Sequence, residues 1–273
     1  MVGVEPHPRR VAAFFDVDRT LVRGSSMLAL AGPLRRAGLL PLWTVVSVAV
    51  RGRQFSTRGF TEEEIQRAVC SVSATVRGMD AAELRRVTDR AIPRVLGPRV
   101  YDEALRLIAW HRARNHLVFL VSASTHDLID KLGEIVGANG VVASEAEIVS
   151  GHYTGTVALC HGTAKAEAVR RLAETHGIDL QSSYAYGDAA GDIPMLETVG
   201  HAVAVNPDRG LRAAAGERGW QTFRFRSPVG WAPLAVAGRP VAPLRVAAPR
   251  PRPEEPELVG AVAAADGVVV AGR

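Results

Sequence analysis

Apolar and polar positions along this chain follow two patterns, one typical of buried strands and one typical of amphipathic helices. Five consecutive apolar residues fill positions 11–15, and apolar runs at 116–122 and 183–188 also end in a polar residue. Such runs predict central strands of a parallel sheet, because helices cover both faces of that kind of sheet. Helical periodicity lies between these runs. The pattern therefore predicts an α/β fold with a parallel sheet.

Weaker patterns complete the predicted core. Turn-forming residues separate short apolar segments throughout the second half of the chain. The expected helices are 101–114, 125–136, 163–176, 192–199 and 211–218; the expected strands are 141–144, 202–205 and 220–225, with a hairpin over 147–155 that turns at Ser150 and Gly151.

The segment 28–97 shows no strand-like alternation and interrupts the α/β pattern. We therefore expect an all-helical domain, inserted into a core formed by residues 11–27 and 98–226. Two helix starts are clear, since Thr61 with Glu64 forms a capping box and Asp80 is an N-cap residue. The expected helices span 27–34, 39–50, 61–73 and 80–95.

The chain changes character at residue 227. Seven of its 16 prolines lie between positions 233 and 256, so residues 227–273 are expected to form a disordered or weakly packed C-terminal tail.

No apolar run reaches the 18 or more residues that a membrane-spanning helix needs. The richest, 39–50, contains a proline and two hydroxyl residues and is expected to be a buried or interfacial helix. The first apolar run ends in two aspartates, which argues against a signal peptide. Cys70 and Cys160 lie far apart without CxxC spacing, so neither a disulfide framework nor a zinc site is expected. These features favour a cytoplasmic protein.

The net charge of +5 is unevenly distributed, because positions 33–100 contain 12 Arg and 6 acidic residues. An Arg-rich segment can meet anionic substrates, an acidic membrane surface or nucleic acid, or it can be a solvated helix face. Basic and aromatic residues do not interleave as they do in single-strand binders, so no nucleic-acid partner is expected. A weak contact between the helical insertion and a membrane surface stays open, and the oligomeric state is not predicted.

Carboxylates mark the ends of two predicted strands. Asp16 ends the first run and Asp18 is the next alternate position, so both carboxylates should point the same way while Val17 faces the core. Two such charges repel each other unless a cation lies between them, and Mg²⁺ is the natural partner of hard carboxylate ligands. Because parallel strands end at one edge of a sheet, Ser122 and Asp188 should lie at the same edge.

Four segments, in order along the chain, resemble the motifs of the haloacid dehalogenase (HAD) superfamily. They are Asp16-Val17-Asp18-Arg19-Thr20, Phe119-Leu120-Val121-Ser122, Lys165, and Gly187-Asp188-Ala189-Ala190-Gly191-Asp192. The resemblance covers about residues 11–225 and is greatest to the phosphoserine-phosphatase-like branch, subfamily IB. It implies a Rossmann-like, HAD-like core with an inserted C1-type helical cap.

The resemblance also implies a Mg²⁺-dependent phosphatase that works through an aspartyl-phosphate. Asp16 would be the nucleophile, and Asp18 would be the general acid and then the general base. The implied metal ligands are Asp16, Asp18, Asp188 and Asp192; the implied phosphate-binding residues are Ser122, Lys165, Ala123 and Thr20.

Each of these residues also has an ordinary structural interpretation. The first two aspartates could be solvated in a turn, Ser122 could be a strand-end hydroxyl, and Lys165 could be a surface lysine. Asp192 could be the N-cap of the helix that follows it. The ordered match of all four motifs favours the functional interpretation.

Two positions depart from the phosphoserine phosphatases. Those enzymes carry a Glu that meets the substrate ammonium where this chain has Ser25, and an Asn where it has Gly191. Another phosphorylated metabolite or a lysophospholipid-like molecule is therefore the expected substrate. The alternatives are a phosphotransferase or mutase of the same superfamily and a non-catalytic regulator that binds a phosphorylated ligand.

Overall fold

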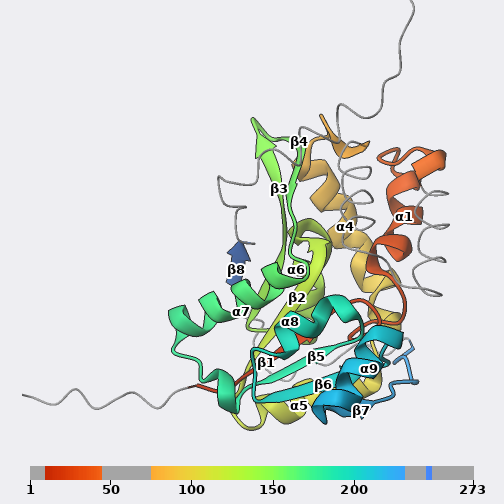
Figure 1. Cartoon of the computed structure of the whole chain (residues 1–273). Helices are drawn as coiled ribbons and strands as arrows, with labels where there is room; N and C mark the ends of the chain where they lie inside the picture. The colour runs from red at the N-terminus through yellow and green to blue at the C-terminus, as the bar shows by residue number, and fades with distance from the viewer. Residues whose placement is uncertain (1–9, 45–74, 231–243, 248–273) are drawn as a thin grey trace, which may run out of the picture.

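The computed structural model of this chain describes residues 10–44, 75–230 and 244–247, and a mixed sheet forms its centre (Figure 1). The strand order is β4-β3-β2-β1-β5-β6-β7, and β8 also pairs with β3. Neighbouring strands are parallel except in the β3–β4 hairpin. The strands are β1 (Ala12–Asp16), β2 (Leu117–Thr125), β3 (Gly140–Val149), β4 (His152–Ala158), β5 (Tyr184–Gly187), β6 (His201–Val205), β7 (Gln221–Phe223) and β8 (Leu244–Ala247).

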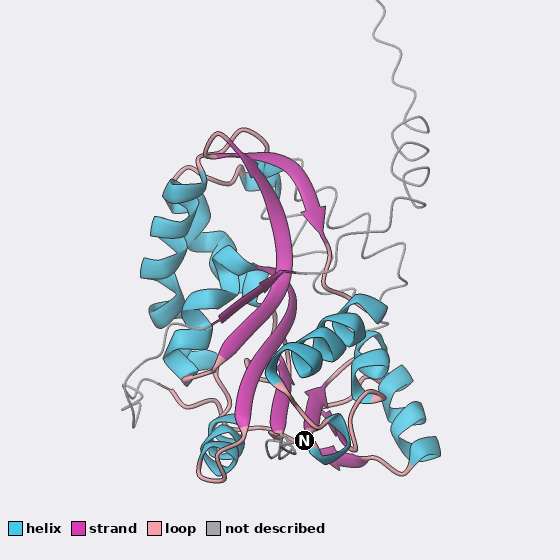
Figure 2. Ribbon diagram, turned by 90° about the vertical axis from the view of Figure 1, so that its left-hand side faces the viewer, coloured by secondary structure: helices cyan, strands magenta, loops and turns pink. Residues whose placement is uncertain are grey.

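Helices cover both faces of the sheet, as the apolar runs predict (Figure 2). They are α1 (Ser26–Arg36), α4 (Ala81–Val95), α5 (Asp102–Arg112), α6 (His126–Val136), α7 (Thr163–His176), α8 (Ile193–Leu196) and α9 (Arg209–Arg218). One core cluster joins one face of the sheet to α1, α4, α5 and α6, and a second joins the opposite face to α7, α8 and α9. The predicted α/β class is confirmed.

Strand β1 lies between β2 and β5 and is buried along its whole length. Its side chains alternate between the two clusters, because successive residues of a strand point to opposite faces. Phe14 stacks on Phe119 with ring centroids 5.6 Å apart, and Phe15 stacks on Tyr186 at 4.3 Å. These contacts on both sides fix the strand that ends at Asp16.

The predicted helical insertion contains α1 and α4, which pack against each other. Asp80 caps α4 as predicted, since its carboxylate accepts the N–H of Glu83 at 2.9 Å. The helix expected over 39–50 starts at residue 42, and the rest of it lies outside the described residues. The helix expected over 61–73, with its capping box, also lies outside them. The domain boundaries themselves stay a prediction.

The β3–β4 hairpin differs from its prediction as a short strand followed by a separate hairpin. Strand β3 is continuous, and it turns into β4 at Ser150 and Gly151, both of which have positive φ. Gly78 N–H donates to the carbonyl of Tyr153, whose own N–H donates to the carbonyl of Met79. The hairpin therefore fixes the segment that leads into α4.

Parts of the predicted C-terminal tail pair with the core. The carbonyl of Ser227 accepts the N–H of Asp102, and Val229 N–H donates to the carbonyl of Val100. Strand β8 pairs in parallel with the first half of β3. Composition indicated a weakly packed tail, but backbone pairing depends little on side-chain type. Within the described residues, no helix is both long and apolar enough to cross a bilayer.

A buried histidine links α5 to the sheet. His111 Nε2 lies 2.9 Å from the hydroxyl of Tyr186, and His111 Nδ1 lies 3.0 Å from His116 Nδ1. Burial, with smaller contributions from His116 and Arg114, lowers the pKa of His111 to about 4. The folded protein therefore holds this imidazole neutral, whereas the unfolded chain protonates it below about pH 6.5.

We expect His111→Gln to flatten the pH dependence of stability between about pH 4 and 6.5. In this window the unfolded wild type binds more protons than the folded one, so its free energy of unfolding falls as the pH falls, by at most about 3 kcal/mol from this group. Urea denaturation at several pH values would measure the difference between the two proteins. An unchanged slope in the variant would show that His111 does not carry this dependence.

Candidate active site at the carboxyl end of the sheet

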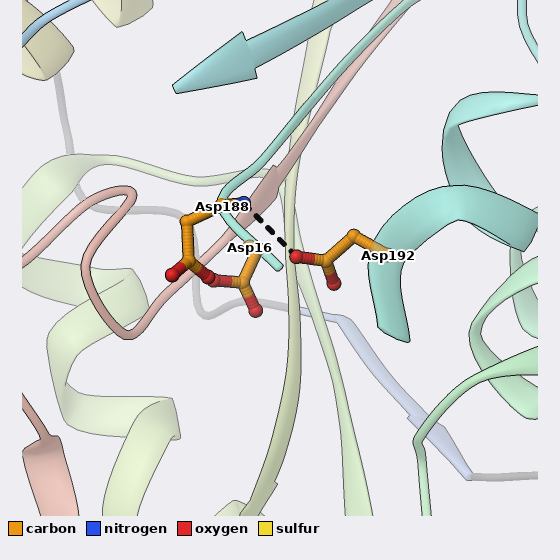
Figure 3. Close-up of side chains that lie close together, drawn as sticks. All are labelled: Asp16, Asp188 and Asp192. Carbon is orange, nitrogen blue, oxygen red and sulfur yellow. Dashed lines mark hydrogen bonds between the residues drawn. The ribbon is translucent and has the colours of Figure 1, made fainter. Parts of the chain in front are cut away.

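Three buried carboxylates meet at the carboxyl edge of β1 and β5. Asp16 ends β1, Asp188 follows β5, and Asp192 ends the short 3₁₀ turn Ala190–Asp192. One oxygen from each lies within 4.8 Å of the others, and Figure 3 shows the three side chains pointing toward one another. Asp16 and Asp188 therefore meet at one edge of the sheet, as the ends of parallel strands predicted, whereas Asp18 is not part of this group.

Lys165 joins two of these acids from the first turn of α7. Its Nζ lies 2.6 Å from Asp16 Oδ1 and 2.7 Å from Asp192 Oδ1, and only 2% of the residue is exposed. Burial alone would lower the pKa of Lys165, but the two carboxylates raise it above its ordinary value. The side chain therefore stays an ammonium group.

One lysine does not balance three acids. Burial, assisted by Asp192 and opposed by Lys165, raises the pKa of Asp16 to about 7. Burial and the neighbouring Asp16 and Asp192 raise the pKa of Asp188 well above its ordinary value. A cation placed between these groups would lower both pKa values, because it would favour the ionised forms.

The oxygens available to a divalent cation belong to Asp16 and Asp188. Asp16 Oδ2 is buried and has no hydrogen-bond partner in the described segments. Asp188 Oδ2 likewise accepts no hydrogen bond of good geometry from the residues that the structure describes, although Arg19 Nε lies 2.9 Å from it. Hard carboxylate oxygens are the usual ligands of Mg²⁺, so this donor set fits such an ion.

Asp192 has a different environment from the other two acids. Its Oδ2 accepts the N–H of Asp188 at 3.0 Å (Figure 3). The same oxygen accepts the N–H of Ala189 at 3.2 Å, and Oδ1 accepts a hydrogen bond from Lys165. Both oxygens are therefore engaged by the protein. Gly187 makes this packing possible, because a Cβ there would lie 2.6 Å from Asp192 Cβ.

Asp18 lies two residues beyond Asp16, with Val17 buried between them as predicted. Asp18 Oδ1 accepts the N–H of Ser26 at 2.8 Å, which joins the loop to the start of α1. Removal from bulk water raises the pKa of Asp18, while hydrogen bonds from Ser26 and Ser25 oppose that rise. A raised pKa increases the protonated fraction of this carboxyl at a given pH, and a general acid has to be protonated before it can donate.

The predicted phosphate-binding residues lie around these acids with fewer direct contacts. Val121 pairs with Asp16 across β1 and β2, so Ser122 follows at the same edge, where its Oγ accepts the N–H of Ser124. The carbonyl of Ala123 accepts the hydroxyl of Ser144. Thr20 is buried, and its Oγ1 has no hydrogen-bond partner among the described residues. Within the described part of the chain, no hydrogen bond joins Ser122, Ala123 or Thr20 to the three carboxylates.

Two residues near the site had no predicted role. Arg19 adopts a left-handed backbone conformation, and its side chain approaches Asp188. His161 lies against Gly191 in the last motif. The position of Arg19 inside the first motif was a usable signal, whereas nothing in the local sequence connects His161 to a residue 30 positions away.

Comparison with known proteins agrees with this geometry. A family model described as haloacid dehalogenase-like hydrolase matches residues 13–197. The probable phosphatase Rv3661 of Mycobacterium tuberculosis is 38% identical over 228 residues, which cover 83% of this chain and 79% of that protein. Phosphoserine phosphatase SerB1 of the same species is 34% identical over 218 residues, covering 79% of this chain and 71% of that protein.

A solved structure of a phosphoserine phosphatase, described as a phospho-aspartyl intermediate analogue, shares the fold. It covers 76% of this chain and 91% of its own, with a TM-score of 0.58 and 21% identity. The family match spans more than half of the 273 residues. The chain therefore belongs to the haloacid dehalogenase-like hydrolases, as a phosphatase of the branch that resembles phosphoserine phosphatase.

Proposed function

We propose that this chain is a Mg²⁺-dependent phosphomonoester hydrolase that forms an aspartyl-phosphate on Asp16. The observation that carries the proposal is the buried cluster in which Lys165 binds one oxygen of Asp16, while the other oxygen has no hydrogen-bond partner among residues 10–44, 75–230 and 244–247. A carboxylate that is oriented through one oxygen and unbonded at the other is suited to nucleophilic attack.

In the first step, an oxygen of the Asp16 carboxylate attacks the phosphorus and the bond to the ester oxygen breaks. Asp18 gives its proton to that leaving oxygen. In the second step, the ionised Asp18 takes a proton from water, whose oxygen attacks the phosphorus and releases Asp16. Lys165 keeps Asp16 oriented throughout, and Ser122, Ala123 and Thr20 are the proposed contacts for the phosphate oxygens.

Asp16 and Asp188, with the backbone carbonyl of Asp18, would hold the Mg²⁺ ion, and Asp192 would act through Lys165 and the bound waters. When bound, the ion neutralises charge on the phosphate oxygens. The raised pKa values of Asp16 and Asp188 support this assignment, because burial and, to a smaller extent, the neighbouring carboxylates disfavour the ionised forms that a bound cation would stabilise. We also propose that the protein acts in the cytoplasm on a small phosphorylated molecule.

Asp16→Asn should lower the release of phosphate from p-nitrophenyl phosphate by at least about 10³-fold, because an amide is a poor nucleophile. Asp89→Asn, which changes an exposed acid on α4, is the matched control and should keep wild-type turnover. Beryllofluoride should bind to the wild type as an acyl-phosphate mimic and should not bind to Asp16→Asn. Appreciable turnover by Asp16→Asn would refute covalent catalysis at this residue.

Removal of divalent cations by a chelator tests whether the activity depends on Mg²⁺. EDTA should abolish turnover, Mg²⁺ should restore it, and Mg²⁺ alone should raise the melting temperature of the wild type, since a ligand that binds only the folded state stabilises it. Asp188→Asn should lose most of this thermal shift. Full activity after exhaustive chelation would contradict the proposal, as would an equal shift in Asp188→Asn.

The substrate prediction follows from Ser25, which caps α1 and brings no negative charge to the site. Burying the ammonium group of phosphoserine without a carboxylate partner would cost on the order of several kcal/mol of binding free energy. We expect kcat/KM for phosphoserine to be at least about tenfold below that for a sugar phosphate or a lysophosphatidate. Ser25→Glu should narrow this gap. If phosphoserine equals or exceeds every alternative, this interpretation of Ser25 is wrong.

A further inference from the structure

A bulge in β2 follows Ser122 at the edge of the sheet where β1 ends. The pairing of β2 with β3 shifts between Ser122 and Thr125, whose partners are consecutive residues of β3. Ala123 and Ser124 are therefore two extra residues of β2. The hydroxyl of Ser144 donates to the carbonyl of Ala123 at 2.7 Å and so holds the bulge against β3. Bulges change the direction of side chains and are frequent beside active sites.

Ser124, the second residue of this bulge, contacts two segments of the proposed site. Its N–H donates to Ser122 Oγ at 3.1 Å, and its own Oγ lies 3.1 Å from Ser26 Oγ at the start of α1. Ser26 is fully buried and only 7% of Ser124 is exposed. The bond between the two hydroxyl groups therefore replaces hydrogen bonds to water that both lose on burial.

Ser26 also contacts the proposed general acid. Its N–H donates to Asp18 Oδ1 at 2.8 Å, because an N–H in the first turn of a helix has no partner within the helix. The hydroxyl and the N–H of Ser26 belong to one residue at the end of a helix. A contact that fixes its side chain therefore also fixes the direction of the N–H that Asp18 accepts. Asp18 is connected in this way, through Ser26 and Ser124, to Ser122.

We propose that Ser124 is a positioning residue, which holds Asp18 through Ser26 so that the carboxyl faces the leaving oxygen of an ester whose phosphate is bound at Ser122. This inference rests on the phosphatase activity proposed above and adds Ser26 and Ser124 to the same site. Neither hydroxyl touches the substrate in this role. The pair matters most for esters with a strongly basic leaving oxygen, such as alkyl phosphates, because that oxygen has to be protonated as it leaves.

The dependence of the rate on the leaving group tests this role. In the full chain with Mg²⁺, kcat/KM is measured for p-nitrophenyl phosphate and for phenyl phosphate, whose leaving oxygen is more basic. Ser124→Ala should lower kcat/KM for phenyl phosphate about tenfold, which is part of the roughly 10²- to 10⁴-fold that a positioned general acid contributes. For p-nitrophenyl phosphate the change should stay below about threefold, since that leaving group needs little protonation.

Two further variants calibrate this measurement. Asp18→Asn, which removes the acid itself, should show the same preference with a larger loss. Ser183→Ala is the matched control, because Ser183 is also buried and its Oγ accepts the N–H of Ala12 at the opposite end of β1. Whatever its effect on the melting temperature, Ser183→Ala should leave the ratio of the two kcat/KM values unchanged.

Ser26→Ala tests whether the two serines act as a pair. Both single variants break the same hydrogen bond, so Ser26→Ala/Ser124→Ala should lose no more activity on phenyl phosphate than the weaker of the two single variants. If Ser124→Ala does not fold, Ser26→Ala decides the question in the same assay.

Equal losses for the two esters in the single variants, or no loss at all, would overturn the inference. Losses that multiply in the double variant would overturn it as well. In each of these cases a wild type that hydrolyses both esters leaves the proposed function in place. A wild type that hydrolyses neither ester would refute the proposed function and, with it, this inference.

Discussion

The need to compensate buried negative charge shapes this structure more than any other interaction. Asp16, Asp188 and Asp192 lie together with at most 6% of each residue exposed. A single ammonium group, that of Lys165, binds two of them, and the guanidinium of Arg19 approaches the third. If these charges were buried without partners, they would greatly destabilise the folded protein. The phosphoryl transfer proposed for this site would make use of such a cluster.

The fold supplies what this cluster requires. Parallel strands place Asp16 and the start of the Asp188 loop at one edge, and α7 brings Lys165 to the same point from a position 149 residues along the chain from Asp16. Because β1 is packed on both faces, Asp16 cannot move away from its like-charged neighbours. Gly187 lets Asp192 lie against the strand end, where it accepts two backbone N–H groups. The rigid sheet thus maintains an arrangement that the charges alone would disfavour.

The sequence alone predicted the strands and the acids at their ends, because both depend on residues that are neighbours along the chain. An apolar run that stops at an acid identifies both a buried strand and a polar group at its end, as at Asp16 and Asp188. Strand β3 was divided in the prediction because its environment changes midway: residues 140–144 are buried between β2 and β8, whereas most of the following residues are exposed in the hairpin. The sequence pattern changes at the same place, so the prediction ended one strand there and began a separate hairpin.

Contacts between distant segments could not be predicted in this way. The ring of His161 against Gly191 depends on how α7 meets the last motif, and neither residue stands out in its own neighbourhood. From the sequence, Gly191 was only a departure from related phosphatases. In the structure it is a spatial requirement, because the glycine makes room for a ring from another element. A substitution at one position and a side chain at another thus have to be interpreted together.

A buried carboxylate also attaches α4 to the core. Asp127, buried in the first turn of α6, accepts a hydrogen bond from Arg85 of α4 at 2.7 Å and one from the hydroxyl of Tyr153 at 2.6 Å. This carboxylate lies five residues after Ser122, on the helix that follows that strand end. The orientation of α4 is thereby coupled, through one paired buried charge, to the segment proposed to bind phosphate. Movement of α4 away from the core would leave Asp127 without its arginine, so the energetics of the site and of this helix are not independent.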